Sequence, residues 1–136
     1  MSARRPFDYL IVQVVPRVER DERLNVGVIL FCPTAGFLGC RFVSQAATES
    51  RLQLFAPDLD VPAVIRQLEA MRAVCAGDTN AGPIARLSTS ERFHWLSAPR
   101  STVVQPSPAH VGLCDDPATA LERLFASVFA DSQRPA

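Results

Sequence analysis

A short, mostly apolar run over residues 24–31, Leu-Asn-Val-Gly-Val-Ile-Leu-Phe, constrains the fold of this chain most strongly. The sequence Cys-Pro-Thr-Ala-Gly follows it at 32–36 and has the composition of a turn. A run of this length that is rich in β-branched and aromatic residues and ends in turn residues is typical of a strand covered on both faces. The run therefore predicts a buried central strand.

Three further stretches predict strands around it. Residues 7–15 are apolar on both faces apart from Asp8 and Gln13, which indicates a second central strand. Residues 37–43 continue directly after the turn, so the first three strands are expected to form an antiparallel meander. Residues 101–105 predict a fourth, more polar strand at an edge, because Pro106 and Pro108 interrupt any further ladder.

Two longer helices are expected in the second half of the chain. Asp60 as N-cap and Gly77 as the terminating residue bound a helix whose apolar residues recur every three or four positions. Asp116 followed by Pro117 predicts the start of a final amphipathic helix. Shorter helices are expected over 51–55, capped by Thr48 or Ser50, and after Ser88, which has capping-box spacing to Glu91.

Strands first and helices later, with one late strand, is the element order of an α+β domain. We expect a two-layer fold in which an antiparallel sheet of about four strands, a three-strand N-terminal meander plus one late strand, carries the two longer helices side by side on one face. A chain of 136 residues falls within the usual size of one domain. Residues 1–136 are therefore expected to form a single domain, with an ordered core over about 6–130 and frayed termini.

Composition excludes several classes of function. The 14 basic and 14 acidic residues cancel, so no overall field attracts nucleic acid or an anionic membrane. The apolar stretch after the N-terminal arginines is too short for a signal peptide or a membrane span, which predicts a cytoplasmic protein. The cysteines lack metal-ligand spacing, so free thiols and no metal or cofactor are expected; whether Cys32 and Cys40, which flank the turn, meet stays open.

The richest polar segment runs from residue 91 to residue 110. Arg100 with Ser101 and Thr102 has the donors to hold a phosphate or carboxylate, and Arg92 and Trp95 add a cation and a stacking face. The candidate interaction or anion-binding residues are Glu91, Arg92, Trp95, Arg100, Ser101, Thr102, Gln105 and His110. The alternative is structural: Arg100 pairs with a carboxylate such as Glu91 to hold a proline-rich loop, and Trp95 belongs to the core.

A second polar segment joins the first two strands. Glu19, Asp21 and Glu22 supply oxygen atoms of the kind that a magnesium site needs. Arginines at 17, 20 and 23 alternate with them, which favours a solvated connection of balanced charge. Neither a nucleophile elbow nor a glycine-rich phosphate loop occurs in the sequence.

Several strings of residues resemble a bacterial family known as domain of unknown function 3037. The strings are Tyr9-Leu10-Ile11-Val12, Val15-Pro16-Arg17, residues 25–30, Glu91-Arg92-Phe93, Trp95-Leu96, residues 98–103 and residues 105–108. The resemblance implies a short stand-alone bacterial protein without an assigned activity, in a family associated with HipA-like kinase proteins. It supplies no catalytic residue.

The leading hypothesis is a non-enzymatic interaction or regulatory module, because no catalytic set of residues is complete. Its partner would be another protein, with a HipA-like kinase as one candidate, or a second copy in a homodimer. The competing hypothesis is a small enzyme acting on a phosphate-bearing substrate or nucleic acid through Arg100 and His110, or through the acids Glu19, Asp21 and Glu22.

Overall fold

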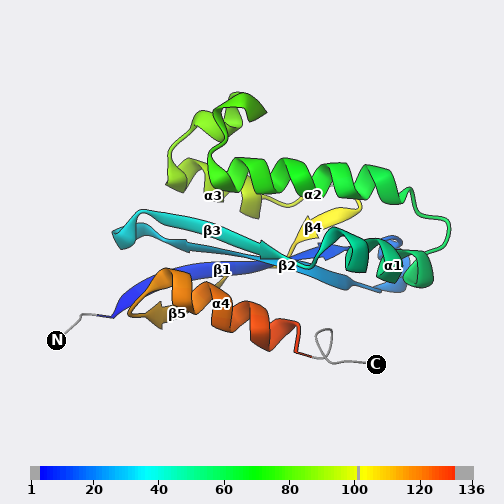
Figure 1. Ribbon diagram of the computed structural model, residues 1–136, viewed down its shortest axis with the longest axis horizontal. Coiled ribbons are helices and arrows are strands. Elements are labelled where there is room, and N and C mark those ends of the chain that lie inside the picture. The colour runs from blue at the N-terminus through cyan, green and yellow to red at the C-terminus, as the bar shows by residue number, and fades with distance from the viewer. Residues whose placement is uncertain (1–3, 101, 131–136) are drawn as a thin grey trace.

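The computed structural model describes residues 4–100 and 102–130. Its strands are β1 (Arg5–Val14), β2 (Leu24–Cys32), β3 (Phe37–Phe42), β4 (Val104–Pro106) and β5 (His110–Cys114), and its α-helices are α1 (Gln45–Phe55), α2 (Val61–Ala76), α3 (Thr89–Ser97) and α4 (Pro117–Val128). Figure 1 shows one twisted sheet with helices above and below it. The α+β class and the antiparallel sheet are confirmed.

Strand β1 organises the sheet. It pairs with β2 on one side, and its other side is shared between β4, opposite Val12–Val14, and β5, opposite Arg5–Tyr9. The order is β3-β2-β1-β4, with β5 also on β1, and all pairings are antiparallel. The predicted N-terminal meander is therefore confirmed. Strands β3 and β5 lie at opposite edges, because β5 pairs only with β1 among the strands that the structure describes.

Strand β2 is buried on both faces, as predicted, since every residue from Val26 to Cys32 is buried. Ile29 and Phe31 join a core cluster with α2 and α3. Leu30 and Cys32 join a second cluster on the other face of the sheet, with α4. A strand in this position needs apolar side chains at consecutive positions, which explains the unbroken run in the sequence.

The two longer helices lie on opposite faces of the sheet. Helices α1, α2 and α3 cover one face, and α4 covers the other (Figure 1). The expectation of two layers with both longer helices side by side is therefore wrong, and the architecture has three layers. The reason is the apolar character of β1 and β2 on both sides, which a single layer of helices would leave half exposed to water.

Two strand expectations and one helix expectation need correction. The late strand is β4 at Val104–Pro106 and not 101–105, and Pro106 lies within it. Strand β5 was not expected, and with it the sheet has five strands where about four were predicted. Helix α1 begins earlier than predicted: its N-cap is Ser44, whose hydroxyl accepts from the Ala47 N–H at 3.3 Å, while Thr48 lies inside the helix and is buried.

The other predicted caps are confirmed. The Asp60 carboxylate accepts from the Ala63 N–H at 3.1 Å, and Gly77 ends α2 with a φ of 70°. Ser88 caps α3, and Asp116 caps α4. No helix in the described part of the chain is long and apolar enough to cross a membrane.

Replacing the N-cap residue of α2 tests whether its hydrogen bond stabilises the start of this helix. We expect Asp60→Ala to lower the free energy of unfolding by about 0.5–2 kcal/mol, because the first turn loses a hydrogen-bond acceptor. Asp58→Ala is the matched control, since that side chain is 95% exposed and lies 3.9 Å from Arg17; we expect a change below about 0.5 kcal/mol. Urea unfolding followed by circular dichroism measures both, and equal losses would contradict the assignment of the cap.

Candidate functional site

Arg100, the first residue of the predicted anion site, follows α3 and is bound by the end of that helix. Its guanidinium donates to the carbonyls of Trp95, Leu96 and Ala98 at 3.2, 3.0 and 3.1 Å. It also lies 4.6 Å from the centre of the Trp95 ring. The last carbonyls of a helix have no partner within the helix, so a cation there stabilises it. Burial lowers the pKa of Arg100. These contacts give Arg100 the geometry of a C-terminal cap of α3.

Arg92 has the same kind of contact with a different helix. One of its terminal nitrogens donates to the carbonyls of Val74 and Cys75, both at 3.0 Å, at the end of α2. The Arg92 Nε is buried without a hydrogen-bond partner. A Cβ at Gly77 would lie 2.7 Å from the Arg92 guanidinium, so the glycine leaves the space that the arginine occupies. Arg92 therefore ties α3 to the end of α2.

Gln105 and Thr102 hold the segment between α3 and β4. The Gln105 Oε1 accepts from the Arg100 N–H at 3.1 Å, and its Nε2 donates to the carbonyls of Arg100 and Thr102. The Thr102 hydroxyl donates to the Val104 carbonyl at 3.1 Å. Ser101 lies outside the described residues. The side chains of Gln105 and Thr102 thus bond with the backbone of their own loop.

Glu91 and His110 do not converge with Arg100, whereas the Trp95 ring lies beside it. The Glu91 carboxylate accepts from the Ser88 hydroxyl at 2.9 Å, so it is not the partner of Arg100. Trp95 packs against the core on the α2 side. His110 is exposed on β5, and its ring lies 5.2 Å from that of Tyr9, which packs against the α4-side cluster. The sheet therefore separates His110 from Arg100, which removes the geometry that joint catalysis would need.

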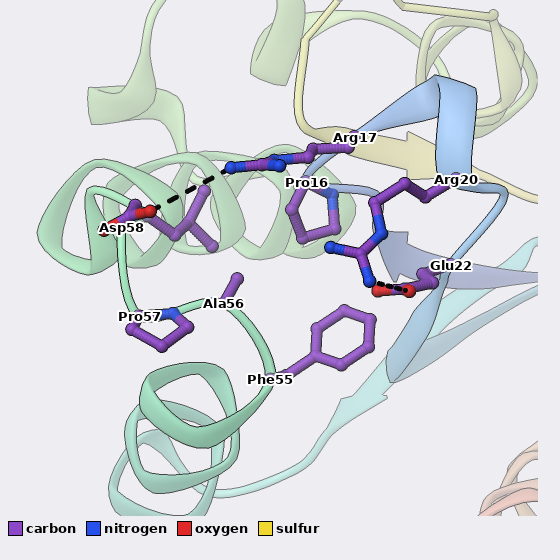
Figure 2. A pocket seen from close by; sticks show the side chains of 9 residues that line it. Pro16, Arg17, Arg20, Glu22, Phe55, Ala56, Pro57 and Asp58 are labelled. Carbon is purple, nitrogen blue, oxygen red and sulfur yellow. Dashed lines mark ion pairs between the residues drawn. The ribbon is translucent and has the colours of Figure 1, made fainter.

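Of the acids between β1 and β2, Glu22 lines a small cavity. Figure 2 shows Arg17, Arg20 and Glu22 on one side of it and Phe55 and Pro57 on the other. The cavity has a volume of about 250 Å³. Arg20 lies 2.9 Å from Glu22, and Arg23 lies 3.4 Å from Asp21. Among the described residues no group of three or more His, Cys, Asp or Glu side chains could hold a metal ion.

A larger groove lies between β5 and α4, with a volume of about 580 Å³. Phe7, Ala120 and Leu124 contribute its apolar surface, and its lining also includes Arg4, Leu113, Cys114, Asp115, Asp116, Thr119, Arg123 and Ser127. Asp116 is held at the start of α4, where the Thr119 hydroxyl and N–H donate to its carboxylate at 2.6 and 3.1 Å. These bonds lower the pKa of Asp116. The first turns of α4 therefore form one wall of the groove.

Strand β5 borders this groove and exposes two large apolar side chains. Val111 is 79% exposed and Leu113 is 60% exposed. They lie opposite Asp8 and Pro6 of β1, so they share the sheet face away from Phe7 and α4. The ring of Phe7 covers Gly112, where a Cβ would lie 2.5 Å from it. The strand thus offers a backbone edge with a groove on one side and an apolar pair on the other.

Sequence reasoning missed β5, although the alternation of His110, Val111, Gly112, Leu113 and Cys114 was visible. Val111 and Leu113 are spaced two apart, as on one face of a strand, but a five-residue stretch with a glycine is a weak signal. The exposure of the pair is a tertiary property. It depends on which part of the sheet the helices leave uncovered, and a local sequence pattern does not show which part that is.

The fold and this edge define a small three-layer α+β protein with an open antiparallel sheet. The family model described as "Protein of unknown function (DUF3037)" matches residues 9–129, and the chain belongs to this family. The expected family is therefore confirmed. Neither the curated proteins nor the solved structures give a match to this chain.

Replacing Arg100 separates a capping role from a ligand-binding role. We expect Arg100→Ala to lower the free energy of unfolding by about 1–3 kcal/mol, because carbonyls at the end of α3 lose a charged donor. Arg66→Ala, an exposed position on α2, should change it by less than about 0.5 kcal/mol. Urea unfolding monitored by circular dichroism gives both values. An Arg100→Ala variant as stable as the parent chain would contradict the capping role and return the guanidinium to the predicted anion site.

Proposed function

We propose that this chain is a non-enzymatic interaction module that binds an extended segment of a partner protein along the free edge of β5. The observation that carries the proposal is the exposure of Val111 and Leu113 on a strand that, within the described residues, pairs with β1 alone. An unpaired edge offers backbone donors and acceptors to an added strand, and side-chain contacts at alternate positions give specificity.

Edge strands that must stay free usually carry charges or proline. The opposite edge strand has such a charge: the exposed Arg41 of β3 lies 3.2 Å from Glu122 of α4. Strand β5 has neither proline nor a lysine, arginine, aspartate or glutamate in its five residues. An edge without this protection is suited to pairing.

The groove beside β5 favours a partner segment over a second copy of this chain. On the groove side, β5 itself offers His110, Gly112 and the buried Cys114, so a second β5 would bring no large apolar side chain to fill the groove. Two five-residue strands alone also bury much less than the roughly 800 Å² per partner of a stable interface. A partner strand with apolar residues at alternate positions fits both the groove and the exposed pair.

The first partner to test is a HipA-like kinase, which the family resemblance suggests, so that the module would bind and regulate it. The purified kinase and chain are mixed and their affinity is measured by calorimetry. We expect the double variant V111K/L113K to bind at least about tenfold more weakly, because charges replace the apolar pair. Leu54→Lys is the matched control, since Leu54 is 87% exposed on α1, away from β5, and should leave affinity unchanged.

Equal affinity of all variants would overturn docking at β5. Size-exclusion chromatography with light scattering at rising protein concentration tests whether a second copy of this chain binds at β5 instead. A dimer that V111K/L113K abolishes would assign the edge to a second copy and would contradict the partner proposal. All variants should unfold at the same urea concentration, because the replaced side chains are exposed.

A further inference from the structure

The cysteines form two pairs, one on each face of the sheet. Cys40 of β3 and Cys75 of α2 are neighbours in the core cluster on the α2 side. Cys32 of β2 and Cys114 of β5 are neighbours in the cluster on the α4 side. All four cysteines are free of disulfide bonds in the structure. Cys32 and Cys40, which flank the turn after β2, therefore do not meet, because they lie on opposite faces.

The two pairs differ in accessibility. Cys40 is half-buried, while Cys75 beside it is 2% exposed. Cys32 is fully buried and its thiol donates to the Pro6 carbonyl at 3.6 Å, and Cys114 is 6% exposed. A small oxidant in solution can therefore reach the sulfur of Cys40 more readily than either sulfur of the other pair.

The pKa of Cys40 is shifted in the direction that favours its thiolate. The hydrogen bond from Cys75 lowers the pKa of Cys40 in spite of burial, with a smaller contribution from the charge of Arg72. Arg72 is held nearby, because its guanidinium lies 5.1 Å from the centre of the Phe42 ring, two residues along β3. The same bond and burial raise the pKa of Cys75, and burial raises the pKa of Cys114. Only the thiolate is a strong nucleophile, so Cys40 is suited to attack and Cys75 to follow.

We propose that Cys40 and Cys75 are a modification site, at which a peroxide oxidises Cys40 and Cys75 then closes a reversible disulfide between β3 and α2. This inference is independent of docking at β5. The disulfide would link α2 covalently to β3, the strand at the opposite edge of the sheet from β5.

The chemistry balances with hydrogen peroxide as the oxidant. The Cys40 thiolate attacks one peroxide oxygen, the O–O bond breaks, and the released hydroxide takes a proton to become water. Cys40 is then a sulfenic acid. The Cys75 sulfur attacks the Cys40 sulfur, the S–O bond breaks, and the hydroxyl group leaves as water with the thiol proton of Cys75. In sum, two thiols and one peroxide give one disulfide and two waters, and an external dithiol reverses the change.

Peroxide treatment of the intact chain, followed by alkylation in denaturant and peptide mass mapping, tests the site. We expect a crosslinked peptide pair containing Cys40 and Cys75 that disappears after treatment with a dithiol, while Cys32 and Cys114 are alkylated as free thiols. Either a Cys32–Cys114 crosslink formed first or no Cys40–Cys75 crosslink at all would overturn the proposal.

Single variants assign the order of the steps. In Cys75→Ser, we expect Cys40 to stop at the sulfenic acid, which dimedone traps. In Cys40→Ser, we expect Cys75 to remain reduced, and oxidation of Cys75 at the parent rate would overturn the order. Cys32→Ser is the matched control from the other pair and should form the Cys40–Cys75 disulfide as the parent does. Circular dichroism checks that each variant is folded before treatment. Peptide mapping of the parent chain tests the disulfide even where a variant does not fold.

Discussion

The pairing of β1 with β2 is the interaction on which the rest of this structure depends. The two strands pair from Asp8–Phe31 to Val14–Leu24, with one extra residue in β2 between Val12 and Gln13. Their side chains supply both core clusters, so the pair lies in the centre of the molecule and every helix packs against a face that it provides. The remaining strands pair with its two sides, β3 with β2 and both β4 and β5 with β1.

The sequence predicted the features that local chemistry determines. Consecutive apolar residues required a strand buried on both faces, and a carboxylate or hydroxyl before an apolar-periodic stretch located the start of α2, α3 and α4. The face that each helix covers could not be predicted, because a stripe such as Leu121 and Phe125 shows that one side is apolar but not which side of the sheet it meets. The two faces of β1 and β2 are alike in polarity, so composition does not distinguish them.

The candidate site shows the same limit for charged residues. Arg92 and Arg100 are visible in the sequence as cations, but their acceptors are backbone carbonyls at helix ends, which no residue letter identifies. The structure places five arginine–carbonyl hydrogen bonds where the sequence suggested a ligand. The surface that we propose for a partner is β5, where a glycine covered by Phe7 separates two exposed apolar side chains.

Amide hydrogen exchange along β5, measured by NMR on the isolated chain at low concentration, tests most directly whether this edge is free. In an antiparallel edge strand, alternate N–H groups bond to the neighbouring strand and the others point outward. We expect the β5 amides that bond to β1 to be protected and the alternate amides to exchange nearly as fast as in an unstructured peptide. Strong protection of every amide in β5 would show that the edge is already covered and would contradict its role as a docking site.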